Sequence, residues 1–377
     1  MKKKKILYIS ASADRGGSEK HLLLLLKYID KDKYDLSLVI FQDGPLVKEY
    51  RNIIDDVRVI DFRSKLSWKK INEIIDIMKE VKPDIVHTHQ PKAHFYALLA
   101  INKLDFKPFK VATFHGLSRQ FRIRDHNMKS GVLQYMMYLF VDRYTLNNID
   151  RVITVSRNNA RILERLVQHK DRIALIPNGV EIIPTAGKKT RIKSLLGLEK
   201  KKIIGTVARL SYEKGVDRLI NAAFPILRQD KDCHLLIVGY GSEKNSLKKL
   251  VRDIHIDKQV TFQRIFSPIE DIFPVFDVYV QPSRIEGLSL ALLQALSSGL
   301  AVVATNAGGN KEVVINNETG ILVPNSDRTN QMTSSIETLL LNEPLALTLS
   351  KKARVMIKND YDIEKIVKQV EHLYDSL

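Results

Sequence analysis

Short apolar runs alternate with longer amphipathic stretches along almost the whole chain of 377 residues. Runs rich in Ile and Val are typical of buried parallel strands, and the stretches between them have the three-to-four-residue period of helices. Strands and helices that alternate in this way are joined by right-handed crossovers and form parallel, doubly wound sheets. The pattern therefore predicts the α/β fold class.

In the first half of the chain, helices are predicted at 71–81, 131–147 and 158–168. The predicted strands lie at 6–9, 36–41, 57–61, 85–88, 111–114, 152–155 and 173–176. The alternation stops at "PNGVEIIPTAGKKTRIKSLLGLEKK" (177–201), whose prolines, glycines and lysines indicate a linker and an entry helix. A second series of strands follows at 203–208, 235–238, 260–262, 278–280, 301–304 and 321–323.

The two series predict two Rossmann-like domains that face each other across a cleft. We place the N-terminal acceptor domain at 1–180 and the C-terminal donor domain at 181–360. The amphipathic segment 361–377 is expected to pack back on the N-terminal domain. Ligands in such sheets bind at the carboxyl ends of the strands, so the chemistry should lie in the loops that follow them.

Composition narrows the class of protein. A single cysteine, Cys233, excludes an internal disulfide framework and favours a reducing, cytoplasmic location. The start, "MKKKKILYIS", has the charge order of a secretory signal but also fits a buried strand, which we favour. No apolar run has the length of a membrane span. The net charge of +17 suits an anionic partner, although a lysine-rich solvated surface gives the same value.

Two loops of the predicted sheets carry groups that suit phosphate. Gly16 and Gly17 precede a helix, whose N-terminal N–H groups and dipole favour an anion; a tight turn with a helix cap is the structural alternative. The G-x-G-x-x-G fingerprint of nicotinamide cofactors is missing there. After the first strand of the second series come Arg209 and Lys214, which suit a diphosphate unless they form a solvated rim.

A third loop, in "SRIEGLSLALLQALSSGLAVVATNAGG" (283–309), carries an acid, Glu286, ahead of an apolar helix and an amide, Gln294, within it. Eight helical residues span about 12 Å, which suits contacts at opposite ends of an extended ligand such as a nucleotide-sugar. Glu286 can bind sugar hydroxyls, and the N–H groups of Gly287, Leu288 and Ser289 can bind further hydroxyls or a phosphate. The alternative is a helix-capping Glu with one buried glutamine.

Several blocks in this order resemble the family-four retaining glycosyltransferases of GT-B fold. They are "GGSEKHLL", "FHG", "VSRNNA", "IPNGV", "ARLSYEKGVDRLI", "LLIVGYG", "VYVQPSRIEGLSLALLQALSSGLAVVATNAGG" and "GILVP". The resemblance covers nearly the whole chain, and its most specific block is the one with Glu286 and Gln294.

The resemblance implies sugar transfer from a nucleotide-sugar with retention at the anomeric carbon and without a metal. It implies that Glu286 contacts the donor sugar, that Arg209 and Lys214 hold the diphosphate, and that His115 lies at the reacting sugar. The loop with Gly16 and Gly17 would face the phosphates. We expect no cofactor besides the co-substrate, for which we predict a UDP-linked sugar.

Two positions depart from the pattern of the family. Gln294 stands where the family usually has a second Glu that binds the ribose, which predicts weaker nucleotide binding or a shifted pose. Arg264, in "VTFQRI", stands where the family often has Gly, and it leaves the identity of the base open.

Metal binding is not expected from the sequence. The D-x-D pairs, which often hold a metal, lie in charged loops or near a helix start, at 30/32, 230/232 and 360/362. In "VHTHQPKAH", His87 and His89 close a predicted buried strand, with His94 soon after. That position fits structural or ligand-edge histidines better than a metal site.

The acceptor is expected to be a glycan or a lipid-linked sugar, as in the synthesis of a surface polysaccharide or glycolipid. Basic and aromatic residues alternate between 103 and 129, which suggests contact with an anionic membrane at its inner face; a basic loop leading into a buried helix is the alternative. The residues concerned are Phe106, Lys107, Phe109, Lys110, Arg119, Phe121, Arg122, Ile123 and Arg124.

Other functions remain open at this point. An epimerase or hydrolase of the same shape would convert the donor without an acceptor, and a non-catalytic protein would bind the nucleotide-sugar without turnover. A nucleic-acid partner is not expected, because no recognition helix or stacking-aromatic pattern accompanies the positive charge.

Overall fold

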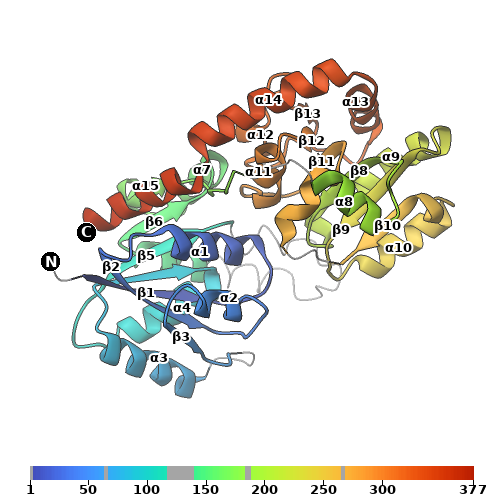
Figure 1. Cartoon of the computed structure of the whole chain (residues 1–377). Coiled ribbons are helices and arrows are strands. Elements are labelled where there is room, and N and C mark those ends of the chain that lie inside the picture. The colour runs from blue at the N-terminus through green and yellow to red at the C-terminus, as the bar shows by residue number, and fades with distance from the viewer. Residues whose placement is uncertain (1–2, 63–66, 117–139, 183–187, 265–267) are drawn as a thin grey trace. The chain divides into compact units, whose positions relative to one another are not determined.

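The computed structural model of the chain describes residues 3–62, 67–116, 140–182, 188–264 and 268–377. It divides into two compact units, Met1–Gly179 with Ile363–Leu377, and Val180–Asp362. Each unit is a parallel sheet with helices on both faces (Figure 1). The sequence prediction of two doubly wound domains is confirmed.

The N-terminal unit contains a seven-stranded sheet in the order β3-β2-β1-β4-β5-β6-β7. Its strands are β1 (Lys4–Ser10), β2 (Tyr34–Ile40), β3 (Asp56–Val59), β4 (Ile85–His89), β5 (Phe109–Phe114), β6 (Arg151–Thr154) and β7 (Ile173–Leu175). Its helices are α1 (Gly17–Tyr28), α2 (Val47–Arg51), α3 (Trp68–Val81), α4 (Pro91–Ile101), α7 (Arg157–Leu163) and the C-terminal α15 (Ile363–Asp375).

The C-terminal unit contains a six-stranded sheet in the order β10-β9-β8-β11-β12-β13. Its strands are β8 (Lys202–Val207), β9 (Cys233–Val238), β10 (Val260–Gln263), β11 (Val278–Gln281), β12 (Ala301–Thr305) and β13 (Ile321–Val323). Its helices are α8 (Lys188–Leu195), α9 (Val216–Gln229), α10 (Lys244–Asp253), α11 (Leu290–Ser297), α12 (Asn310–Val313), α13 (Asn330–Leu341) and α14 (Glu343–Asp360), with 3₁₀ turns η2 (Tyr212–Lys214) and η4 (Ile269–Val275).

The elements form where apolar side chains can be buried. All residues of β9 are buried, as expected for a strand covered by helices on both faces. In α3 the buried residues Ile71, Ile74, Ile75 and Met78 recur at helical spacing and line one face. The start of the chain forms β1, which pairs with β2 and β4 inside the sheet. The strand interpretation of this segment is therefore confirmed.

Two predicted helices differ from the structure or fall partly outside it. The helix predicted at 158–168 ends at Leu163, because the N–H of Leu166 turns back to Leu163 and that of Gln168 binds the side chain of Asn147. Of the helix predicted at 131–147, residues 140–147 are helical, and 131–139 lie outside the described residues.

Candidate functional site

Both sheets reverse their strand order beside their first strand. β1 lies between β2 and β4, and β8 lies between β9 and β11. Parallel sheets bind ligands beyond the carboxyl ends of the strands at such a reversal. Gly16 and Gly17 follow β1, Arg209 and Lys214 follow β8, and Glu286 follows β11, whereas His115 follows the neighbouring β5. The glycine, cation and Glu286 loops thus lie at these reversals, whereas His115 lies one strand further along its sheet and Gln294 lies within α11.

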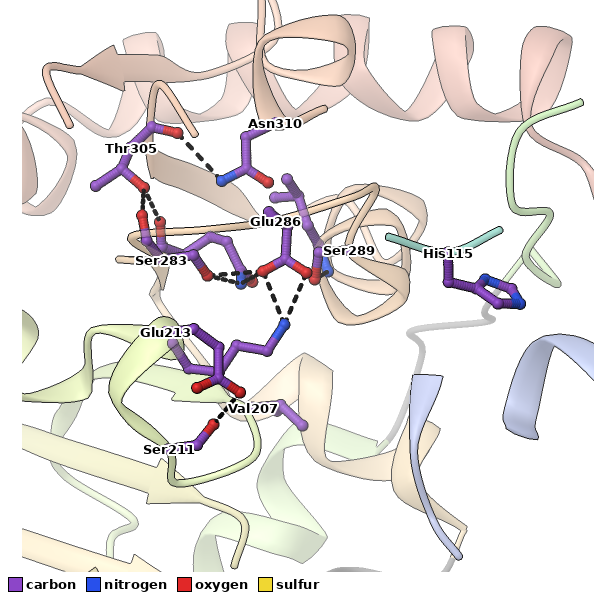
Figure 2. A network of polar contacts seen from close by, with 12 residues as sticks. His115, Val207, Ser211, Glu213, Ser283, Glu286, Ser289, Thr305 and Asn310 are labelled. Carbon is purple, nitrogen blue, oxygen red and sulfur yellow. Dashed lines mark hydrogen bonds and ion pairs between the residues drawn. The ribbon is translucent and has the colours of Figure 1, made fainter. Parts of the chain in front are cut away.

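Glu286 is a buried carboxylate held by several donors (Figure 2). Its side chain is 7% exposed and forms an ion pair with Lys214, whose Nζ lies 2.7 and 2.8 Å from the two carboxylate oxygens. Ser283 Oγ donates to Glu286 Oε2 at 2.8 Å. Gln281 Nε2 approaches the same oxygen at 3.4 Å. Two residues that the sequence analysis assigned to different parts of the donor, Glu286 and Lys214, therefore contact each other.

A second layer of hydrogen bonds holds these donors in place. Gln281 Nε2 donates to Ser283 Oγ at 2.8 Å, and Tyr279 OH donates to Gln281 Oε1 at 2.9 Å. Thr305 Oγ1, at the end of β12, donates to the carbonyl of Ser283 at 2.6 Å. Asn310 Nδ2 donates to the carbonyl of Thr305 at 3.1 Å (Figure 2). The loop after β11 is thus fixed by side chains from β11, β12 and α12, none of which the sequence analysis had singled out.

The glycine turn beyond β12 supports the loop that carries Glu286. Gly308 has a φ of +53°, and a Cβ at this position would lie 1.8 Å from the carbonyl oxygen of Glu286. The N–H of Gly309 donates to the carbonyl of Gly287 at 2.8 Å. The two loops therefore lie backbone to backbone, and only glycine fits between them.

Lys214 is positioned by a similar close contact. It ends η2 and is followed by Gly215, which has a φ of +63°. A Cβ on Gly215 would lie 2.2 Å from the carbonyl oxygen of Pro282, so the loop after β8 rests on the loop after β11. Arg209, earlier in the same loop, is exposed and forms no ion pair with the described residues. Arg209 is thus available to solvent, whereas Lys214 is engaged by Glu286.

The structure corrects the helical spacing between Glu286 and Gln294. Helix α11 begins at Leu290, and Ser289 caps it by accepting the N–H of Leu292. Glu286, Gly287 and Leu288 lie in the preceding loop, so the rise of a straight helix does not apply to their separation from Gln294. Gln294 is 7% exposed, and its Nε2 donates to Glu270 Oε1 of η4 at 3.2 Å. An amide rather than an acid at 294 thus avoids two adjacent carboxylates.

In the N-terminal unit, Gly16 caps α1 without a side-chain bond, and α1 begins at Gly17. A Cβ on Gly17 would have no neighbour within 4 Å, so packing inside the chain does not require this glycine. The loop is fixed by Gln90, which the sequence analysis missed. Gln90 Oε1 accepts the N–H of Ala11, and its Nε2 donates to the buried Glu19 at 2.7 Å. Gln90 has a φ of +73°, a strained conformation for a residue with a side chain.

His115 belongs to a group of buried imidazoles with His21 and His89. The ring centroids of His21 and His115 lie 5.0 Å apart, and those of His89 and His115 lie 5.9 Å apart. Burial lowers the pKa of His21 to about 4 and lowers the pKa values of His89 and His115 well below the usual range. The three rings are therefore neutral at pH 7. The sequence analysis named His89 and His115 separately and did not include His21.

Other predicted features lie away from these loops. Asp30 and Asp32, and likewise Asp230 and Asp232, come before the amino ends of β2 and β9, where one side chain of each pair accepts the N–H of the other residue. Arg264 follows β10 and is exposed.

The predicted basic and aromatic segment is only partly described. Arg119, Phe121, Arg122, Ile123 and Arg124 lie outside the described residues. Phe109 is 44% exposed. The ammonium of Lys110 is 3.1 Å from Asp150, so this lysine is paired within the protein. Lys107 and Phe109 line a surface pocket of about 940 Å³ at the amino ends of β1, β4 and β5. None of the predicted site residues lines it, and we assign it no part in the reaction.

Two families match the chain. Glycosyltransferase Family 4 matches residues 15–182, and Glycosyl transferases group 1 matches residues 188–356. The chain belongs to the family-four glycosyltransferases. The resemblance read from the sequence is thus confirmed, and the protein is an enzyme that transfers a sugar.

This glycosyltransferase is similar over most of its length to two named bacterial glycosyltransferases. An Escherichia coli UDP-Gal:alpha-D-GlcNAc-diphosphoundecaprenol alpha-1,3-galactosyltransferase is 27% identical over 98% of this chain and 96% of its own length. The capsular polysaccharide biosynthesis glycosyltransferase CapM of Staphylococcus aureus is 24% identical over 93% of this chain and 92% of its own length. In fold, this glycosyltransferase is similar to Anabaena HepE, whose structure is in complex with UDP and glucose. The TM-score is 0.86 at 19% identity, and the match covers 99% of this chain and 100% of HepE. This likeness confirms the GT-B fold.

No helix within the described part of this glycosyltransferase is both long and apolar enough to cross a membrane.

Proposed function

We propose that this glycosyltransferase transfers a sugar from a UDP-sugar to a lipid-linked or glycan acceptor, with retention at the anomeric carbon and without a metal. The main support is the network in which the buried Glu286 is bound by Lys214 and Ser283 at the carboxyl end of β11. The galactosyltransferase relative, whose name gives a UDP-sugar and a diphosphoundecaprenol-linked acceptor, supports the choice of donor and acceptor. The capsular relative supports a role in surface polysaccharide synthesis.

The charges of the C-terminal unit suit the reaction. Breaking the bond between sugar and phosphate leaves negative charge on the diphosphate, which preorganised cations stabilise in the transition state. Arg209 and Lys214 share one loop and can supply both positive charges. Of the three D-x-D pairs, 30/32 and 230/232 lie at the opposite edges of the sheets and bind their own backbones, and 360/362 lies at the end of α14. Metal independence is therefore proposed from the position of the cations and carboxylates.

Glu286 is held for hydrogen bonding to sugar hydroxyls. Its two oxygens are fixed by Lys214 and Ser283, so a hydroxyl that replaces or joins these donors meets a preformed acceptor. We propose that Lys214 shifts from Glu286 to the diphosphate when the donor binds. We also propose that the imidazole of His115 contacts the reacting sugar and that the departing phosphate takes the proton of the acceptor.

The test is release of UDP by the purified enzyme with UDP-galactose, UDP-glucose or UDP-N-acetylglucosamine and a GlcNAc-diphospho-lipid acceptor. We expect one donor to be turned over in EDTA at the same rate as in Mg²⁺, and the new linkage to be α by NMR. Glu286→Gln should lower kcat at least 100-fold, whereas Glu318→Gln, which changes an exposed Glu of the same unit, should have wild-type activity.

Three results would contradict the proposal. Turnover that stops in EDTA and returns with Mg²⁺ would show a metal requirement. An inverted linkage would exclude retention. Near-normal turnover of Glu286→Gln would show that the reaction does not use this carboxylate.

A further inference from the structure

Three histidines from separate elements of the N-terminal unit point their ring nitrogens at one another. His21 lies on α1, His89 ends β4, and His115 immediately follows β5. One ring nitrogen from each lies within 4.8 Å of those of the other two. Zinc ligands in a tetrahedral site are about 3.4 Å apart, given a bond of about 2.0–2.1 Å to each nitrogen. The rings would therefore have to close by at most about 1.4 Å.

Four of the six ring nitrogens of this group are buried without a hydrogen-bond partner among the described residues. His21 Nδ1, His115 Nε2 and both ring nitrogens of His89 are buried without a hydrogen bond. An unsatisfied buried polar atom costs about 1–3 kcal/mol, so four of them in one place are unusual. The neighbouring His87, whose ring is 4.5 Å from that of His89, differs because its nitrogens bind Thr113 and Tyr374. The unsatisfied nitrogens are thus concentrated where the three rings meet.

We propose that His21, His89 and His115 bind a divalent transition-metal ion of the zinc class. Three imidazoles are a common ligand set for such ions and leave a fourth position for water or a ligand. Magnesium and calcium prefer oxygen ligands, so they are not expected here. All three ligands come from the N-terminal unit, whereas the loops that we assign to the donor diphosphate belong to the C-terminal unit, and the transfer reaction does not need the ion.

Metal binding has a consequence that rests on the proposed function. A bound ion occupies a ring nitrogen of His115, the residue that we place at the reacting sugar. The ion would therefore keep this imidazole from the donor and inhibit transfer. The site would therefore be an inhibitory metal site in an enzyme that does not itself require a metal.

Binding is tested first without any activity measurement. The full-length protein, freed of metal with a chelator, is titrated with Co²⁺, whose visible absorption reports coordination by a few nitrogen ligands. We expect one Co²⁺ per chain, displaced by Zn²⁺. His21→Asn and His89→Asn should each weaken Co²⁺ binding at least tenfold. His94→Asn is the matched control, because His94 is also buried with an unpartnered Nε2 but lies outside the group.

Circular dichroism and thermal unfolding in chelator establish that each variant is folded. If His89→Asn does not fold, His115→Asn, at a less buried position, takes its place. Absence of Co²⁺ absorption in the wild-type protein overturns the proposal. The proposal is also overturned if the folded His21 and His89 variants bind Co²⁺ with wild-type affinity. It is overturned as well if His94→Asn loses as much affinity as they do.

The second measurement is UDP release in EDTA and in excess Zn²⁺. We expect Zn²⁺ to lower the wild-type rate at least fivefold, reversibly, and to have less than a twofold effect on His21→Asn relative to its own rate in EDTA. If Co²⁺ binds but Zn²⁺ does not inhibit transfer, the metal site is supported, and the proposed contact of His115 with the reacting sugar is contradicted. Absence of transfer in EDTA contradicts the proposed function and leaves the metal site intact.

Discussion

The hydroxyl of Ser283 is the neutral group that binds Glu286 most closely. It donates to Glu286 Oε2 and accepts from Gln281 Nε2, and the Thr305 hydroxyl donates to the backbone carbonyl of Ser283. A hydrogen bond to a charged group contributes about 1.5–3 kcal/mol. The side chain of Ser283 therefore determines how firmly the carboxylate is held for the donor sugar.

Replacing Ser283 by alanine should lower kcat about tenfold or more, because about 1.4 kcal/mol of transition-state stabilisation corresponds to a factor of ten. The KM for the donor should change less than threefold, since the diphosphate contacts remain. Steady-state kinetics of UDP release measure both. The control is Ser246→Ala, which removes an exposed hydroxyl bound to the half-buried Glu243 of the same unit. Equal kcat values for the two variants would contradict a positioning role for Ser283.

Gln294 donates to Glu270 at the position where the family resemblance led us to expect an acid. A glutamate at 294 would place a second carboxylate about as close to Glu270 as the amide is now, 3.2 Å. Like charges at this distance repel when they are partly buried. The amide at 294 and the acid at 270 therefore have to be considered as a pair.

Gln294→Glu alone should lower the free energy of unfolding by about 1–2 kcal/mol, because it places two carboxylates side by side. Gln294→Glu with Glu270→Gln should recover most of this loss, since the pair is again an acid and an amide. If an acid at 294 binds the ribose, the double variant should also bind UDP about fivefold more tightly than wild type. Urea unfolding and calorimetry of UDP binding measure the two effects. If the two substitutions lower the free energy of unfolding additively, residues 270 and 294 do not interact as a pair.

At the scale of elements, the strands were the most predictable part of the molecule. A strand buried on both faces requires a continuous apolar run, so β9 and its neighbours are visible in the sequence. The ends of helices were less predictable, because side chains from elsewhere determine them. Helix α7 stops at Leu163, with the N–H of Gln168 bound by Asn147, and α11 starts only at the Ser289 cap.

The candidate site was predictable to the same extent as the strands. Loops at strand ends could be located, and Glu286 and Lys214 lie in two of them. Their ion pair could not be predicted, because it depends on how the loop after β8 packs on the loop after β11. Gln90 and His21 were missed for the same reason. Their contacts join separate elements of the N-terminal unit, and no local sequence pattern indicates such contacts.

Substitutions in the turn after β12 test how far backbone packing determines the position of Glu286. Gly308→Ala would push against the carbonyl of Glu286, so it should lower kcat at least tenfold and destabilise the protein. Gly299→Ala is a matched control, because Gly299 also has a positive φ, +71°, but has no neighbour of its Cβ nearer than 3.7 Å. It should cost about 1 kcal/mol of stability through backbone strain alone and leave kcat unchanged. Similar kcat values for the two variants would show that the contact does not matter.

At the scale of the whole molecule, the chain leaves the N-terminal unit after Gly179 and returns to it at Ile363. The returning helix α15 is anchored through polar groups as well as apolar ones. Tyr374 OH lies 3.0 Å from Tyr8 OH and binds the buried His87. Tyr34 OH donates to Asp375 at 2.8 Å. The last residues of the sequence thus complete the core of the first unit, so the stability of that unit depends on both ends of the chain.

That core also contains neutral histidines, which should make it sensitive to acid. His94 is buried on α4, its Nδ1 lies 2.7 Å from Thr88 Oγ1, and burial lowers its pKa to about 3. The pKa of histidine in the unfolded chain is about 6.5, so the unfolded state binds this proton first as the pH falls. The contribution of the neutral ring to the free energy of unfolding is therefore complete above pH 6.5. It is lost progressively as the pH falls from 6.5 to about 3.

For one such residue the free energy of unfolding falls by about 1.4 kcal/mol per pH unit, or about 2 kcal/mol at pH 5. His94→Asn should therefore have a shallower loss of stability between pH 6.5 and pH 5 than wild type, even if it is less stable at pH 7. The single tryptophan, Trp68, lies on α3 in the same unit, and its fluorescence in urea reports the transition. The exposed His255 of the C-terminal unit provides the control, since His255→Asn should keep the wild-type pH dependence. Parallel pH profiles for wild type and His94→Asn would show that His94 does not bind its proton as the unit unfolds.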